Sequence, residues 1–208
     1  MTYKLSCIKT SKNHNGDFLA IDWAKVPTSP SFIHTDGDGG EAISTSVQAA
    51  WDREFLYVRF QCEDYDILAS MQDRDDPLYE EEVVEVFLAP KKSDEYYEFN
   101  LSPKNVVFDS FIKHDGERHQ GDPEWNCPEL KHKVVRDNPK SDIFGNWSGY
   151  LAIPFKCLDV SPVVGDTWKA NFYRIKRIGG DQYLAWSPTL TRPAYFHVPS
   201  KFGALVFI

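Results

Sequence analysis

The sequence predicts an all-β fold, an antiparallel β-sandwich of jelly-roll or immunoglobulin-like type, and two observations support this prediction. Apolar and polar residues alternate with a period of two in many runs, as in strands that bury one face. The runs are short and are separated by turn-forming residues, as in sandwiches built from hairpins. A single domain over residues 1–208 is expected, because 42% hydrophobic residues suffice for one sizeable core.

The elements follow in chain order. Residues 1–42 are rich in Asn, Pro, Gly and Ser and are expected to wrap the sandwich as strand and loop. Residues 43–51 and 55–62 are predicted to form a hairpin around the turn "DRE". Further strands are predicted at 82–89, 95–102, 105–112, 129–135, 146–153, 166–175, 182–187 and 203–208. One short helical turn is predicted at "PFKCL" (154–158), where Pro154 suits a first helical position.

The charge of the chain argues against some classes of binding partner. The formal net charge of −8 and the pI near 5.2 argue against nucleic acid and anionic membrane, because phosphate binding needs a concentrated basic surface. No signal peptide or transmembrane segment is visible, and the compartment is unknown because removal of a leader would leave no trace. The cysteines lack any C-x-x-C spacing, so buried thiols are expected at Cys7, Cys62, Cys127 and Cys157, with a disulfide as the alternative. No cofactor is expected to be required.

Pairing arithmetic places an unusual carboxylate, Glu85, which stands between Val84 and Val86 in an apolar run. Strands 82–89 and 95–102 are joined by a loop of hairpin length, so they are expected to pair antiparallel. If both apolar faces point into the core, opposed residues have numbers that sum to about 185. Glu85 then lies opposite Asn100 on the outer face, where the same register opposes Phe87 to Glu98 and Val83 to Ser102.

The strand at 166–175 adds to this outer face. Its alternation turns Asn171 and Tyr173 outward, so Asn171 joins Glu85 and Asn100 if the strands are neighbours. Ordinary solvated strand residues remain the alternative. Arg174 falls on the core-facing side, where a structural ion pair with an acidic residue is the simplest expectation.

Four sequence blocks resemble a family 9 carbohydrate-binding module, within the DOMON-like group of β-sandwiches. They are "WDREFLYVRFQCED" (51–64), "DPLYEEEVVEVFLAP" with "YYEFNLSPKN" (76–105), "GYLAIPFKCL" with "GDTWKANFYRI" (149–175), and "AWSPT" with "FHVPSKFGALVF" (185–207). The resemblance implies a protein that binds the end of a plant polysaccharide such as xylan, or a small saccharide. Family members of known function hold a sugar ring between two aromatic side chains.

The resemblance also implies where the aromatic clamp lies. The first ring precedes the strand that matches "VVEVF" and falls on Tyr79. The second precedes the "PSKFG" segment and falls on Phe196, or on its neighbour Tyr195. Family members often have Trp at both places, so these residues imply a weaker or different clamp.

The polar partners implied by the resemblance are Glu85, matched to the family's sugar-contacting acid, and Asn100 with Ser102 on the following strand. This set suits the chemistry of a sugar. The C–H patches of a pyranose ring pack on aromatic faces, and its hydroxyl groups hydrogen-bond to carboxylate and amide groups.

The acidic loop before Tyr79 suggests a metal site. Asp73, Asp75 and Asp76 are dense enough to contribute to a calcium site, which takes about six to eight oxygen ligands. Related modules carry structural calcium, so the resemblance favours this hypothesis. No EF-hand spacing is present, and a solvated acidic loop is the alternative.

Two other functions stay open. A glycoside hydrolase, or an accessory domain acting beside one, would use carboxylates about 5 to 10 Å apart, and Glu85 and Glu98 share a face. Modules of the family are generally non-catalytic, which favours binding without catalysis. The third alternative is a DOMON-like scaffold without sugar binding, which the absence of Trp at both clamp positions favours.

Overall fold

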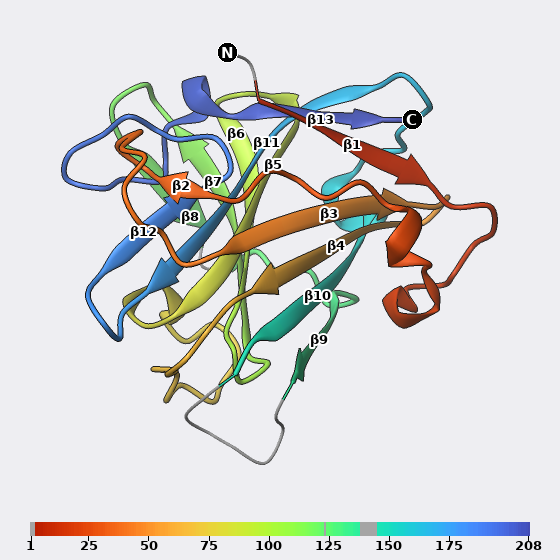
Figure 1. Ribbon diagram of the computed structural model, residues 1–208. Helices are drawn as coiled ribbons and strands as arrows, with labels where there is room; N and C mark the ends of the chain where they lie inside the picture. Colours follow the sequence, from red (N-terminus) through yellow and green to blue (C-terminus); the bar gives the residue numbers. More distant parts are fainter. Residues whose placement is uncertain (1–2, 123, 138–144) are drawn as a thin grey trace.

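The computed structural model describes residues 3–122, 124–137 and 145–208. Within them the chain forms a sheet of 13 strands in the order β8-β7-β6-β5-β11-β13-β1-β3-β4-β10-β9, with β12 joined to β11 and β2. The strands are β1 (Lys4–Lys9), β2 (Ile33–His34), β3 (Thr45–Trp51), β4 (Phe55–Cys62), β5 (Val83–Lys92), β6 (Glu95–Leu101), β7 (Val107–His114), β8 (His119–Asp122), β9 (Lys131–Arg136), β10 (Trp147–Pro154), β11 (Thr167–Lys176), β12 (Gln182–Ala185) and β13 (Gly203–Phe207). The sheet folds over, so that β3, β4 and β10 face β5, β6 and β11 across the core (Figure 1). This is the predicted β-sandwich.

One part of the predicted topology is wrong. Strand β1 pairs parallel with both β13 and β3, so the sheet is mixed and not wholly antiparallel. Residues 1–42 therefore do more than wrap the sandwich, because β1 lies inside the sheet between these two strands. Its Leu5 and Cys7 are buried in the main core.

Short helical turns are more frequent than predicted. The predicted turn is present as η4 (Phe155–Leu158), but Pro154 precedes it as the N-cap and does not occupy the first helical position. Four other 3-10 turns were not predicted: η1 (Phe18–Ala20), η2 (Trp23–Lys25), η3 (Leu78–Glu80) and η5 (Pro199–Lys201). None of the helices in the described part of the chain has the length and apolar character needed to span a membrane.

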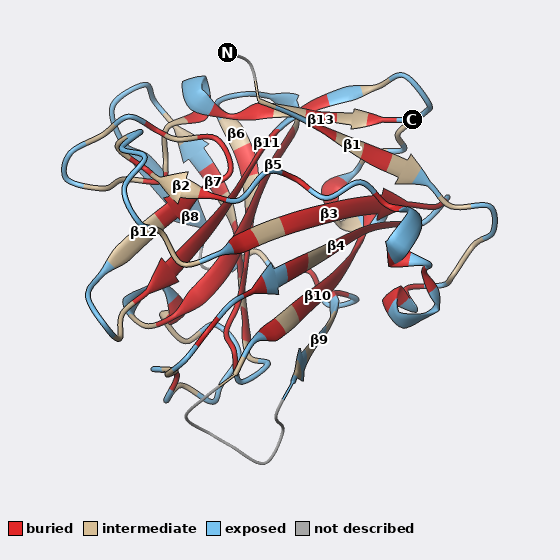
Figure 2. Ribbon diagram, in the orientation of Figure 1, coloured by how far each residue is buried: buried red, intermediate tan, exposed pale blue. Residues whose placement is uncertain are grey.

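Loop segments cover the outer faces of both halves of the sheet. Phe18 and Trp23 of the N-terminal segment pack on Tyr57 and Tyr150, outside β4 and β10. Leu78 of η3, Phe196 and Phe202 pack on the outer face of β5, β6 and β11. Figure 2 shows that β5 and β11 are buried along most of their length. Residues on both faces of these strands are therefore buried.

A buried ion network lies at one end of β11. Asp64 accepts a hydrogen bond from Arg174 at 2.9 Å and lies 3.0 Å from the Lys176 ammonium, and that ammonium lies 2.7 Å from Glu82. These four side chains are at most 2% exposed. The prediction that Arg174 pairs with an acidic residue is confirmed. The four cysteines are free thiols, as expected, and Cys7, Cys62 and Cys127 are buried. The predicted burial is wrong for Cys157, which is partly exposed.

Candidate functional site

The predicted register at Glu85 is confirmed. Strand β5 pairs antiparallel with β6, opposing Glu85 to Asn100 and Phe87 to Glu98. On its other side β5 pairs with β11, which brings Tyr173 opposite Glu85. Glu85 therefore lies in the central strand of three, and Glu98 is its diagonal neighbour on the same face. Such diagonal neighbours have Cα atoms about 7–8 Å apart, within reach of two glutamate side chains.

The outer face that carries Glu85 is buried, so the alternative of ordinary solvated strand residues is wrong for Glu85 and Asn100. Glu85 is only 1% exposed and Asn100 is fully buried. The cause is the layer that contains Leu78, Phe196 and Phe202, which strand alternation within β5 and β6 could not reveal. Glu85 thus faces away from the main core yet remains shielded from bulk water.

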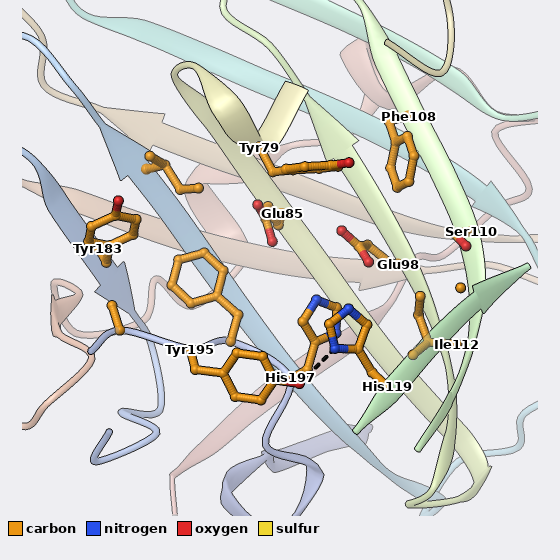
Figure 3. Close-up of a pocket in the computed structure, with 14 residues that line it drawn as sticks. Tyr79, Glu85, Glu98, Phe108, Ser110, Ile112, His119, Tyr183, Tyr195 and His197 are labelled. Carbon is orange, nitrogen blue, oxygen red and sulfur yellow. Dashed lines mark hydrogen bonds between the residues drawn. The ribbon is translucent and has the colours of Figure 1, made fainter. Parts of the chain in front are cut away.

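A pocket of about 440 Å³ opens within this covering layer. Of the residues predicted for the site, Tyr79, Glu85, Tyr195 and Phe196 line it. Figure 3 shows Tyr79 on one side, Tyr195 with two histidines on the other, and the carboxylates of Glu85 and Glu98 between them. The pocket therefore combines aromatic walls with two acids.

The aromatic residues differ in how far their rings are free. Tyr79 is 46% exposed, and η3 holds it edge-on to Phe108 with ring centroids 5.8 Å apart. Phe196 is only 8% exposed because it stacks on Tyr173 at 4.2 Å, so it forms a wall more than a free clamp. Tyr195 is partly exposed, and its hydroxyl group hydrogen-bonds to Nδ1 of His119 at 2.6 Å.

The carboxylates form an interacting pair. Burial raises the pKa of Glu98 to about 7, although a hydrogen bond from Asn100 to its Oε1, 2.9 Å long, acts in the other direction. Burial, followed by repulsion from Glu98, raises the pKa of Glu85 well above its usual value. Oε1 of Glu85 is buried without a hydrogen-bond partner. The pair therefore retains a proton near neutral pH and has unused hydrogen-bonding capacity toward the pocket.

Two histidines that line the pocket were not predicted from the sequence. His119 and His197 stack with ring centroids 3.5 Å apart, and Nδ1 of His197 lies 2.8 Å from the Tyr96 hydroxyl. Burial lowers the pKa of both, that of His197 to about 3, so both rings are neutral at pH 7. His119 comes from β8, whose sequence "HQGD" has no apolar alternation and consists of exposed residues. Phe108, Ser110 and Tyr183 also line the pocket without having been predicted.

Three predicted polar residues lie outside the pocket lining. Asn100 is fully buried, and its amide donates a hydrogen bond to Glu98, which does line the pocket. Asn171 anchors the chain after β12, since its amide donates to the Ser187 carbonyl and its Oδ1 accepts from the Ser187 N–H. Ser102 holds the turn between β6 and β7, where its Oγ accepts from the Val106 N–H. The ladder ends before Ser102, so its predicted pairing with Val83 is not formed.

Two of the three loop aspartates contact groups of their own loop. Asp76 accepts hydrogen bonds from the N–H groups of Gln72 and Asp73, and Asp75 lies 3.8 Å from the Arg74 guanidinium. In the part of the chain that the structure describes, no group of three or more His, Cys, Asp or Glu side chains could hold a metal ion. These carboxylates stabilise the loop, and calcium binding stays an untested prediction.

The chain is similar in sequence to a curated protein and similar in fold to solved structures. An extracellular protein of Arthroderma benhamiae is 27% identical over 202 residues, covering 88% of this chain and 90% of that protein. A candidate carbohydrate-binding protein from Bacteroides uniformis superposes with a TM-score of 0.80 at 20% identity, over the full length of both chains.

A family 9 carbohydrate-binding module from Caldicellulosiruptor kristjanssonii was solved with glucose, and it superposes with a TM-score of 0.65 at 16% identity, covering 99% of this chain and 95% of that one. A complex with cellotriose from the same organism gives 0.62 at 15% identity, with 98% and 93% covered. At these identities the structures establish the shared fold. The family model for carbohydrate-binding family 9 matches residues 44–207, well over half of the chain, and the protein therefore belongs to that family.

Proposed function

We propose that the pocket binds a saccharide, either a small sugar or the end of a polysaccharide chain, without cleaving it. The observation that carries this proposal is the placement of Glu85 and Glu98 between Tyr79 on one side and Tyr195 on the other. Aromatic faces accept the C–H patches of a sugar ring, and carboxyl oxygens accept its hydroxyl groups. The volume lies within the range of small-molecule sites.

Two solved structures support the proposal. The family 9 modules of Caldicellulosiruptor kristjanssonii were solved with glucose and with cellotriose, and both share the fold of this chain. Family membership rests on a match over residues 44–207, which include every pocket residue. A glucose-type ligand is therefore the first to test.

Tyr79→Ala is expected to weaken saccharide binding about tenfold, close to 1.4 kcal/mol, because it removes the more exposed of the facing rings. Calorimetric titration with glucose, cello-oligosaccharides and xylo-oligosaccharides measures this. Tyr65→Ala is the matched control, since Tyr65 is 45% exposed and lies outside the pocket. It should bind as the wild type does.

Equal affinity in wild type and Tyr79→Ala would contradict the proposed placement of the ligand. No binding by the wild type across neutral, amino and acidic sugars would contradict carbohydrate binding itself and favour a scaffold role. Thermal unfolding of both variants separates loss of contact from loss of fold.

Hydrolysis is the second candidate, favoured by the shared pocket of Glu85 and Glu98. A retaining or inverting glycosidase needs one protonated and one ionised carboxyl group on either side of the scissile bond. Here burial raises the pKa of both acids, and both come from adjacent strands of one hairpin. The arrangement therefore favours binding. Release of reducing sugar that Glu98→Gln abolishes would favour hydrolysis instead.

A further inference from the structure

The two buried acids of the pocket lack a cationic partner. No Lys or Arg occurs among the described residues that line the pocket. Glu98 accepts a hydrogen bond from the neutral Asn100 amide, and Oε1 of Glu85 has no partner at all. Both side chains are buried, Glu85 at 1% and Glu98 at 4% exposure. Buried charges in folded proteins are normally paired, and the negative charge left on the pair when it shares one proton has no counter-ion among the described lining residues.

The neighbouring titratable groups supply no positive charge. Burial lowers the pKa of His119 and of His197, which keeps both imidazoles neutral at pH 7. Burial also raises the pKa of the tyrosines around the pair, which keeps their hydroxyl groups protonated; these are Tyr79, Tyr96, Tyr173 and Tyr195. Any charge on the described lining of the pocket therefore comes from Glu85 and Glu98, and it is negative.

Arg177, a cation that contacts the lining residues Tyr79 and Tyr183, already has partners of its own. The Arg177 guanidinium donates to the Tyr183 hydroxyl at 2.6 Å and pairs with Asp181 at 2.9 Å. It also donates to the backbone carbonyls of Tyr79 and Glu80. These contacts hold Arg177 at the rim, where its charge is compensated by Asp181.

We propose that the preferred ligand is an amino sugar, whose protonated amino group lies between Glu85 and Glu98 while its ring packs against Tyr79. This inference rests on the proposed saccharide function and specifies the substrate class of the same pocket. An ammonium group is a three-fold hydrogen-bond donor without an acceptor, which matches two carboxylates that offer only acceptors when ionised.

An ammonium group suits this pocket better than a hydroxyl group. A sugar hydroxyl can donate to Oε1 of Glu85, but it leaves the negative charge of the two buried side chains uncompensated. An ammonium group supplies both the donor and the opposite charge. The aromatic walls add attraction, because a cation is favoured near the face of an aromatic ring. The two features together discriminate an amino sugar from its neutral analogue.

The test compares three β-1,4-linked oligosaccharides that share a backbone: one of glucosamine units, one of N-acetylglucosamine units and one of glucose units. In calorimetric titrations of the wild type at pH 7, the glucosamine oligosaccharide is expected to bind about tenfold or more tightly than either neutral ligand. Repeating the titration in buffers of different ionisation enthalpy should show protons released on binding, because the cation replaces the proton shared by the carboxyl pair.

Glu85→Gln and Glu98→Gln keep the shape of each side chain and remove its charge. Each is expected to reduce the preference for the glucosamine ligand to about threefold or less, with much smaller losses for the neutral ligands. Glu41→Gln makes the same change in net charge at an exposed position outside the pocket and should leave the preference intact. Two separate pocket variants keep the test valid if one of them fails to fold.

The outcomes separate this inference from the function on which it rests. Equal or tighter binding of the glucose oligosaccharide by the wild type overturns the amino-sugar inference and leaves saccharide binding standing. A preference for glucosamine that persists in both pocket variants also overturns the amino-sugar inference. The ammonium group would then bind at a site other than the carboxylates of Glu85 and Glu98. Absence of binding by all three ligands overturns the proposed function together with the inference.

Discussion

Lys176→Met is expected to lower the free energy of unfolding by about 3–5 kcal/mol, the largest effect anticipated for a single side chain in this protein. The Lys176 ammonium lies between two buried carboxylates, 3.0 Å from Asp64 and 2.7 Å from Glu82. Methionine retains similar volume but removes the charge. Asp64 then keeps Arg174 as its cationic partner, whereas Glu82 keeps the backbone N–H groups of Arg177 and Ile178 as donors, and its Oε2 already lacks a hydrogen-bond partner.

Urea unfolding at neutral pH measures this difference, with the free energy extrapolated to water. Lys169→Met is the matched control, because Lys169 lies on the same strand with its side chain exposed. It should change stability by less than about 0.5 kcal/mol. A loss below about 1 kcal/mol in Lys176→Met would show that the network contributes little, and that the acids are neutralised in another way.

The second large effect concerns pH. Stability is expected to fall by roughly 3 kcal/mol between about pH 4.5 and pH 7 through Glu98, whose pKa burial raises from 4.5 to about 7. The sign follows from proton binding. Between these values the unfolded chain has lost the proton while the folded chain keeps it, so folding is favoured at low pH and this contribution disappears as the pH rises through 7.

Glu98→Gln isolates this contribution, because glutamine does not titrate and still offers an oxygen to the Asn100 amide. The difference in stability between wild type and variant, measured by denaturant unfolding across this pH range, should shift in favour of the variant as the pH rises. A difference independent of pH would contradict the assigned burial of Glu98.

The hairpin around Glu85 was predictable because two independent constraints agree. Strand alternation fixes which face is apolar, and the short loop between β5 and β6 fixes the register, so Glu85 could be placed opposite Asn100. The resemblance to family 9 modules then directed attention to Tyr79 and Phe196, and both line the pocket.

The depth of the pocket was not predictable for a physical reason. The outer face of β5 is buried by Leu78, Phe196 and Phe202, and these come from short turns and loops without periodic patterning. Strand alternation reports which face a side chain is on, but not whether a later segment covers that face. His119 was missed for the same reason, because β8 consists of exposed polar residues and glycine.

The presence of a polar residue on the outer face did not by itself identify a residue that lines the pocket. Asn171 and Ser102 lie on the covered side of the sheet, yet backbone groups of neighbouring loops occupy their hydrogen-bonding atoms. Buried amides and hydroxyl groups commonly stabilise loops in this way. Their distinction from a ligand-binding residue depends on contacts across the fold, which a single sequence does not contain.

The central claim, that the pocket between Tyr79 and Tyr195 holds the saccharide, is tested most directly by an NMR titration of the ¹⁵N-labelled protein with the tightest-binding sugar. Saturable shifts are predicted for the backbone amides of Glu85, Ser110 and Gly121, which line or support the pocket. Amides on the opposite side of the sandwich, such as that of Tyr150, should not move. Saturable shifts confined to that opposite side would contradict the claim.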